Sequence, residues 1–250
     1  MLSAAEVAKK YVDIGKGKAE LPAGRAFCLA VLAGAFIALA GVGSTVGGAL
    51  TNKVVGAAIF PAGLAMVVVA GSELFTGNCL LVIPLLERKI TLQRMLCSWL
   101  IVYLGNLVGG VLVAAVTSLA GTFDAISDTV AATAAAKTAL PFGAALLRGI
   151  LCNFLVCIAV WMALAAQTVG GKIAGVFFPV FLFVLCGFEH SVANMFYIPA
   201  GFFVRARCGA EADITLYGMW VRNLLPVTLG NIIGGGAVGA AYRTVYLRKK

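Results

Sequence analysis

Long apolar stretches that carry almost no charge recur along this chain and leave few folds open to it. An α-helix needs about 20 consecutive apolar residues to cross a bilayer. The chain is 62% hydrophobic, whereas soluble domains are about 45–50% apolar. The sequence therefore predicts an all-α polytopic membrane protein with six transmembrane helices. We place them at about 26–44, 54–70, 92–120, 140–166, 173–203 and 217–242. A polar loop that carries Asp124, Asp128 and Lys137 is expected at 121–138, between the third and fourth spans.

The distribution of positive charge predicts how the chain is oriented. Most of the 19 lysines and arginines lie in residues 1–25, in the loop at 87–94, at Lys172 and in the tail at 243–250. Cytoplasmic loops of membrane proteins are enriched in these residues. We therefore expect cytoplasmic N- and C-termini in the cell inner (plasma) membrane, and we interpret the net charge of +9 as loop charge rather than as a nucleic-acid surface. No cleavable signal peptide is visible.

The first 25 residues are expected to form a cytoplasmic segment of their own. Val7, Tyr11 and Ile14 recur at helical spacing among charged residues. This pattern predicts an amphipathic helix that lies along the membrane surface. An ordinary cytoplasmic tail helix is the alternative.

Two of the apolar stretches are interrupted by short polar sequences that match each other. Gly71-x-Glu73 in the first interruption corresponds to Gly187-x-Glu189 in the second, and LGNLVGG at 104–110 corresponds to LGNIIGG at 229–235. Each half of the chain has three spans, so the second half is inverted relative to the first. The sequence thus predicts one channel domain over 1–250, built from inverted three-helix repeats at 26–120 and 139–243, each with a broken helix. Such folds place the path of the permeant between the two breaks.

Glu73, Glu189 and His190 are ionisable groups that lie deep in the spans, next to the interruptions. A charge at the bilayer centre costs about 2.5–3.5 kcal/mol on insertion scales, so each should have a partner or a function. Glu73 and Glu189 lie at equivalent places in the two halves, which favours a structural anchor over a proton relay. His190 is the only histidine and its counterpart is Leu74. This asymmetry favours a role with the permeant over a histidine satisfied in the core.

Several other residues are candidates for the same path. Thr76 lies at the equivalent depth in the first interruption, so its hydroxyl and His190 could together hold one small anion. Lys137 precedes the fourth span and could attract anions into a vestibule, or it could simply be solvated. Apolar side chains that could form a constriction, or could equally face lipid, are Phe60, Leu64, Phe75 and Phe183.

Other chemistry has little support in the sequence. The seven cysteines include no CxxC pair, and we interpret the six that fall in or beside apolar spans as small core residues. No nucleotide-binding loop, metal-ligand cluster or nucleophile motif is visible. We therefore expect no metal, no cofactor, no nucleic-acid partner and no enzymatic activity.

At this point the motifs resemble those of the formate–nitrite transporter family, over almost the whole chain. The resemblance rests on GSELFTGN at 71–78, LCNFLVCIAVWMAL at 151–164, GFEHSVANMFYIP at 187–199 and LLPVTLGNIIGGG at 224–236. It implies an aquaporin-like fold and a homopentamer in which each protomer has its own pore. It also implies transport of small monovalent anions or their conjugate acids, among them formate, nitrite and hydrosulfide.

By the same resemblance, the family's central histidine corresponds to His190 and its loop threonine to Thr76. Its vestibule lysine corresponds to Lys137 and its fourth-span asparagine to Asn153. Its two hydrophobic slits correspond to Leu64 with Phe183 and to Phe60 with Phe75.

The resemblance does not separate the substrates. The C-terminal third is most similar to formate channels, whereas GSELFTG is more similar to nitrite channels; formate is the best single prediction. Coupling to protonation at His190 stays open, as does the choice between a channel and a proton-coupled transporter. A water channel is disfavoured because aquaporins carry Asn-Pro-Ala at both breaks. A membrane enzyme that uses Glu189 and His190 lacks a nucleophile or cofactor motif.

Overall fold

A computed structural model describes residues 1–247, and every regular element within them is helical. Arg248, Lys249 and Lys250, which belong to the predicted positive tail, lie outside the described residues. The first half contains α1 (Ala4–Ala19), α2 (Ala23–Leu50), α3 (Lys53–Ile59), α4 (Pro61–Ala70), α5 (Phe75–Asn78), η1 (Cys79–Leu81), α6 (Val82–Leu86) and α7 (Leu92–Leu119). The second half contains η2 (Asp124–Ile126), α8 (Ser127–Thr138), α9 (Phe142–Ala165), α10 (Val169–Leu185), α11 (Ser191–Cys208), η3 (Gly218–Leu224) and α12 (Leu225–Tyr246).

Among residues 1–247, five helical units are long and apolar enough to cross a membrane: Ala23–Leu50, Lys53–Ala70, Leu92–Leu119, Phe142–Ala165 and Gly218–Tyr246. They correspond to five of the six predicted spans. The sixth, predicted at 173–203, is divided into α10 and α11 and is therefore a broken element. The first span is longer than predicted, because residues 45–50 carry no charge and the helix continues to Leu50.

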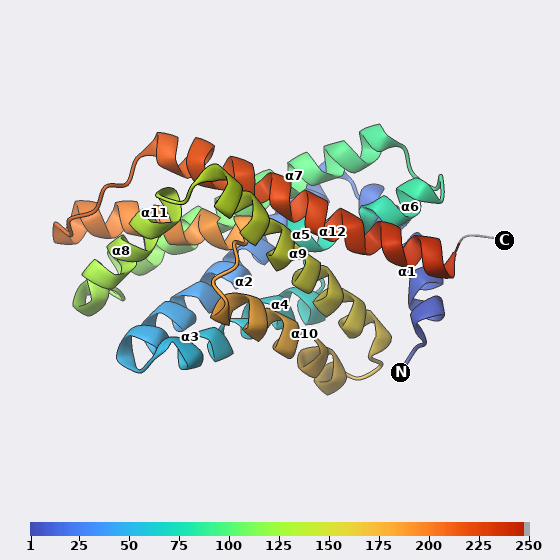
Figure 1. The fold of residues 1–250 in the computed structure, drawn as a ribbon, viewed down its shortest axis with the longest axis horizontal. Helices are drawn as coiled ribbons and strands as arrows, with labels where there is room; N and C mark the ends of the chain where they lie inside the picture. Colours follow the sequence, from blue (N-terminus) through green and yellow to red (C-terminus); the bar gives the residue numbers. More distant parts are fainter. Residues whose placement is uncertain (248–250) are drawn as a thin grey trace.

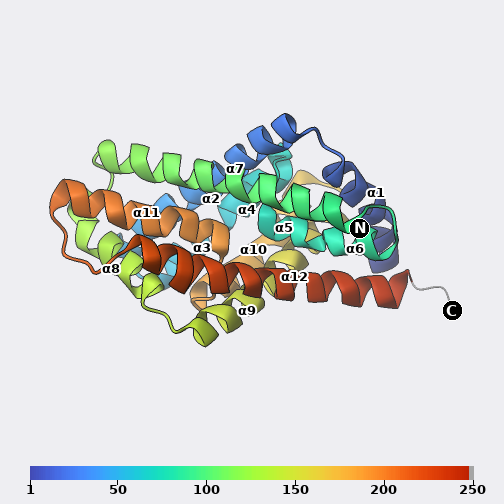
Figure 2. The same ribbon diagram turned by 90° about the horizontal axis from the view of Figure 1, so that it is seen from above.

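The two ends of the described chain lie at the same end of the long axis, next to α1 and α6 (Figures 1 and 2). The opposite end is formed by α8 and by the connection from α11 to η3. Between them, α2 packs along α7 and α9 packs along α12. Glycines allow both helix pairs to approach closely. A Cβ on Gly109 of α7 would lie 2.1 Å from the carbonyl oxygen of Val31 in α2, and a Cβ on Gly234 of α12 would lie 2.1 Å from that of Ile150 in α9. The LGNxxGG sequences therefore permit close helix packing.

Helix α1 does not present its apolar face to lipid. Its buried residues include Val7 and Tyr11, and the helix packs on α6, α9 and α12. Protein therefore covers this apolar face, and the position of the helix along the membrane surface stays a prediction. At its start, the Ser3 N–H and hydroxyl donate to the Glu6 carboxylate. These bonds hold the pKa of Glu6 below its ordinary value.

The segment at 121–138, expected to be a polar loop, contains the helix α8. Its alanine-rich sequence favours helix, and the helix packs on α11 with Ala131 and Ala134 fully buried. Helices α1 and α8 thus occupy corresponding positions, each directly before the first span of its half.

Both predicted helix breaks are present and begin at a glycine in the left-handed region. Gly71 ends α4 with φ 77°, and Gly187 follows α10 with φ 69°. Glycine adopts this conformation without steric cost, which ends a helix at a defined residue. After each glycine the chain is extended until α5 begins at Phe75 and α11 begins at Ser191. These two extended segments carry Glu73, Glu189 and His190, and Thr76 follows in α5.

Candidate functional site

A buried asparagine holds the extended segment of the first half in place. The Asn106 side chain donates to the carbonyl oxygens of Ala30 (2.7 Å) and Glu73 (2.9 Å). Its oxygen accepts the backbone N–H of Phe75 at 2.9 Å. Buried peptide groups that leave a helix need such partners, because no water is available in the bilayer core.

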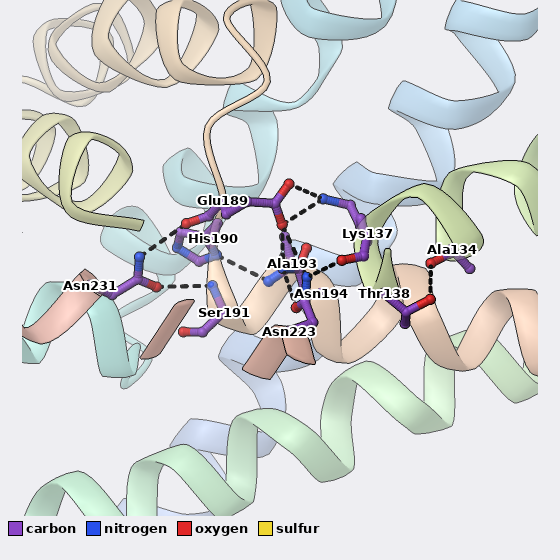
Figure 3. Close-up of polar contacts among 10 residues, drawn as sticks. All are labelled: Ala134, Lys137, Thr138, Glu189, His190, Ser191, Ala193, Asn194, Asn223 and Asn231. Carbon is purple, nitrogen blue, oxygen red and sulfur yellow. Dashed lines mark hydrogen bonds and ion pairs between the residues drawn. The ribbon is translucent and has the colours of Figure 1, made fainter. Parts of the chain in front are cut away.

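Asn231 does the same in the second half (Figure 3). It donates to the carbonyl oxygens of Gly149 (2.8 Å) and Glu189 (3.0 Å), and it accepts the N–H of Ser191 at 2.9 Å. The two asparagines therefore bind equivalent atoms in the two halves. The internal repeat is visible at the level of single hydrogen bonds.

The Glu189 carboxylate lies in a network of donors at the α8 end of the molecule (Figure 3). Lys137 contacts both of its oxygens, at 3.0 and 3.1 Å, and Asn194 donates to it at 2.6 Å. Asn223 lies at 3.5 Å from the same carboxylate and donates to the Lys137 carbonyl oxygen at 2.9 Å. The buried charge is thus paired, and Lys137 is held at a fixed position.

Glu73 is paired in the same way at the opposite end. Its carboxylate receives a bond from Lys18 at 2.7 Å and one from Asn78 at 2.7 Å. Both glutamates therefore pair with a lysine and an asparagine, an arrangement that supports the interpretation as structural anchors.

Lys18 is a site residue that the sequence reasoning missed. It lies on α1, which was interpreted only as an amphipathic helix. Lys18 precedes Ala30 by 12 residues, and Lys137 precedes Gly149 by 12 residues. The equivalence of Ala30 and Gly149 is visible only through their bonds to Asn106 and Asn231, so this spacing identifies the lysine pair once the structure is known.

His190 and Thr76 meet where the two breaks come together. The distance between His190 Nε2 and Thr76 Oγ1 is 2.9 Å, and both side chains are buried. His190 Nδ1 accepts the N–H of Ala193 at 3.0 Å, which caps the start of α11. An imidazole nitrogen accepts only when it carries no proton. The ring is therefore neutral in this arrangement, with its proton on Nε2 directed at Thr76.

Two cavities approach the Thr76–His190 contact. We call the larger, of about 400 Å³, the outer vestibule; its lining includes Lys137, Phe60, Phe183, Glu189, His190 and Tyr197. The inner vestibule, of about 310 Å³, is lined by residues that include Tyr11, Lys18, Leu64, Glu73, Leu74 and Asn78. Each vestibule thus contains one lysine–glutamate pair.

The predicted constriction residues differ in where their side chains lie. Phe60 and Phe183 face each other, with ring centroids 5.9 Å apart, and both line the outer vestibule. Leu64 lies one turn further along α4 and lines the inner vestibule, as does Leu74. Phe75 lines neither cavity, because its ring packs against Trp99 and Tyr103. The contact between Phe60 and Phe183 is not one of the predicted pairings. The pairing of Leu64 with Phe183 and of Phe60 with Phe75 in two slits stays a prediction.

Asn153 lies behind the site rather than in a vestibule. Its side chain is buried and donates to the carbonyl oxygens of Thr76 (3.1 Å) and Asn231 (2.7 Å). It thereby connects the two halves and positions Thr76. Direct binding of substrate by Asn153 stays a prediction.

The comparisons with known proteins agree with one another. The "Formate/nitrite transporter" family model matches residues 5–245. A "Probable formate transporter" of Methanothermobacter thermautotrophicus is 38% identical, over 99% of this chain and 98% of the relative. The "Formate channel FocA" of Escherichia coli (strain K12) is 37% identical, over 100% of this chain and 96% of the relative.

Solved structures extend this similarity to the fold. An "FNT family ion channel" has a TM-score of 0.86 at 32% identity, over 96% of this chain and 98% of its own. A "Pentameric formate channel with formate bound" has a TM-score of 0.78 at 34% identity, over 90% of this chain and 98% of its own. The fold, the paired helix breaks and these matches together show that the chain belongs to the formate/nitrite transporter family.

Proposed function

We propose that this protein conducts a small monovalent anion across the membrane through each protomer, with formate as the leading substrate. The observation that carries the proposal is the Thr76–His190 contact of 2.9 Å between two cavities that each contain a lysine. The similarity to formate transporters and channels supports the choice of substrate. Nitrite and hydrosulfide channels of the same family are the alternatives.

The two lysines attract the anion into either vestibule. Lys137 and Lys18 are partly exposed, with side-chain exposures of 17% and 26%. Lys137 and Lys18 are each paired with a glutamate, so their exposed ammonium N–H groups, rather than their net charge, stabilise an entering anion. Lys53 also lines the outer vestibule and adds a positive charge there. The positive end of the α11 dipole adds to this attraction beside His190.

Passage between the vestibules requires the anion to replace a hydrogen bond. An anion that separates Thr76 from His190 receives the Nε2–H of His190 in place of the threonine hydroxyl. The rings of Phe60 and Phe183 on one side, and Leu64 and Leu74 on the other, offer it no hydration. Its conjugate acid crosses such apolar walls at much lower cost. We infer that the permeant takes up a proton in a vestibule and crosses in neutral form.

His190 acts in this scheme as a hydrogen-bond donor and not as a proton wire. A relay through the ring would need Nδ1 to take up or release a proton. Nδ1 is occupied by the N–H of Ala193, which cannot pass on its proton. The proton that accompanies the anion therefore comes from water in the vestibule.

The protein is expected to assemble as a homopentamer in the inner membrane, with α1 and both termini on the cytoplasmic side. The similarity to a pentameric formate channel supports the assembly, and the positive charge near α1 supports the orientation.

The proposal is tested by measuring uptake of formate, nitrite and hydrosulfide side by side into proteoliposomes at two pH values. We expect formate to enter fastest, and we expect its uptake to rise as the external pH is lowered, because the neutral acid is then more abundant. Vesicles without protein are the control. Faster uptake of nitrite or hydrosulfide would contradict the choice of substrate, and uptake that does not depend on pH would contradict crossing as the neutral acid.

A further inference from the structure

Tyr197, on α11, contributes an aromatic ring to the outer vestibule. Its side chain is half-buried, and Lys137 Nζ lies over the ring, 5.3 Å from its centroid. The face of an aromatic ring attracts a cation at this distance. The ammonium group that pairs with Glu189 is therefore also held by the Tyr197 ring.

The same ring contacts the constriction of the outer vestibule. It is stacked on Phe60, with ring centroids 6.4 Å apart and ring planes at 18°. Phe60 in turn meets Phe183 edge to face, with centroids 5.9 Å apart. Both geometries are favourable for aromatic pairs. The position of the Phe60 ring thus depends on Tyr197 as well as on Phe183.

Tyr197 also packs on the backbone of α2. A Cβ on Gly41 of α2 would lie 3.6 Å from Cζ of Tyr197 and 2.7 Å from the ring of the neighbouring Phe196. Rings packed this closely against a helix have little freedom to shift, because protein interiors are close-packed. Tyr197 is therefore a fixed support for the side chains that it contacts.

The internal repeat does not account for this tyrosine. YIP at 197–199 corresponds to VIP at 82–84, so Val82 occupies the equivalent position in the first half. Val82 does not line the inner vestibule, whose apolar lining includes Leu64 and Leu74. The aromatic support thus belongs to the outer side, like the histidine that lines the same cavity.

We propose that Tyr197 is a positioning residue that makes the outer constriction selective for the smallest carboxylate. By holding the Phe60 ring near Phe183, it keeps the passage narrow and so disfavours a carboxylate that carries a methyl group, such as acetate. Without the Tyr197 ring, Phe60 loses its stacking partner and can turn away from Phe183. The inference rests on the proposed function, because it requires that the permeant passes these rings.

Uptake of acetate and of formate into proteoliposomes, measured for the wild type and for Tyr197→Leu, tests this proposal. Leucine removes the ring and keeps an apolar side chain. One additional methylene group changes discrimination in an apolar pocket by roughly 10- to 200-fold. We therefore expect the acetate-to-formate uptake ratio to rise by about tenfold or more in Tyr197→Leu. Tyr197→Phe keeps the ring and should keep the wild-type ratio.

Tyr242→Leu is the matched control. It makes the same substitution at a tyrosine that is stacked on Trp161, with ring centroids 4.2 Å apart. Tyr242 lines neither vestibule. Loss of a stacked tyrosine at this position should therefore leave the acetate-to-formate ratio at the wild-type value.

A double variant determines whether Tyr197 acts through Phe60. Phe60→Leu removes the ring that Tyr197 supports. Residues in contact give non-additive effects when one acts through the other. Adding Tyr197→Leu to Phe60→Leu should therefore change the ratio no further.

Three results would overturn the proposal. They are an unchanged ratio in folded Tyr197→Leu, an equal rise in Tyr197→Phe, and the full rise when Tyr197→Leu is added to Phe60→Leu. If Tyr197→Leu does not fold, Tyr197→Met takes its place with the same expected rise, because methionine is flexible and fills irregular gaps. Absence of formate uptake by the wild type would instead contradict the proposed function, whereas formate uptake with an unchanged ratio would contradict only the role of Tyr197.

Discussion

Replacing His190 with phenylalanine is expected to lower formate uptake by about 10- to 100-fold, whereas replacement with glutamine should preserve most of it. Phenylalanine keeps the ring that stacks on Phe183, with centroids 5.8 Å apart, but removes the Nε2–H. Hydrogen bonds to charged groups contribute about 1.5–3 kcal/mol, which corresponds to the expected loss of rate. Glutamine carries an amide N–H near the same position and does not titrate.

Together, the phenylalanine and glutamine variants distinguish hydrogen-bond donation by His190 from a change in its protonation. Uptake should be measured in proteoliposomes against pH, with protein folding checked by gel filtration. The pH dependence should survive in His190→Gln, because the proton comes from vestibule water. Two results would mean that the charge change of the imidazole is required. One is loss of formate uptake in both variants; the other is uptake that no longer depends on pH in His190→Gln while it still does in the wild type.

Replacing Lys137 with glutamine should reduce formate uptake more than tenfold and should also destabilise the protein. The Glu189 carboxylate is 5% exposed and would lose the partner that contacts both of its oxygens. Breaking a buried ion pair from one side costs about 3–5 kcal/mol. The uncompensated carboxylate would also repel anions from the outer vestibule.

The double variant Lys137→Gln/Glu189→Gln is the control for that result. It removes the lone charge, so most of the lost stability should return, while uptake stays below the wild-type rate because the lysine is absent. Lys18→Gln makes the same change on the inner side and should resemble Lys137→Gln. Wild-type uptake in both single lysine variants would show that the vestibule lysines do not attract the permeant.

The spans and both helix breaks were predictable from the sequence because they depend on local chemistry. Hydropathy identifies a membrane-spanning helix, since the bilayer requires its apolar length. A glycine with a glutamate two residues later, inside an apolar stretch, indicates a helix break. Gly71 and Gly187 have φ angles in the left-handed region, which favours glycine at these positions. The His190–Thr76 pairing followed from the equivalent depth of the two breaks.

Features that depend on packing between distant elements were not predictable in the same way. The rings of Phe60 and Phe183 meet because α4 packs on α10, and nothing local in either sequence indicates that contact. Lys18 reaches Glu73 only because α1 packs on the end of the bundle. The segment of α8 was assigned to a polar loop because it carries Asp124, Asp128 and Lys137 between two apolar spans.

The central claim is that the Thr76–His190 contact opens to formate, which crosses there as its conjugate acid, and not to water. Stopped-flow light scattering tests it directly, with proteoliposomes exposed either to a formate gradient or to an impermeant osmolyte. We predict rapid reswelling in formate and, in the osmolyte, shrinkage at the rate of protein-free vesicles. Accelerated shrinkage in the osmolyte without reswelling in formate would contradict the claim and indicate a water channel.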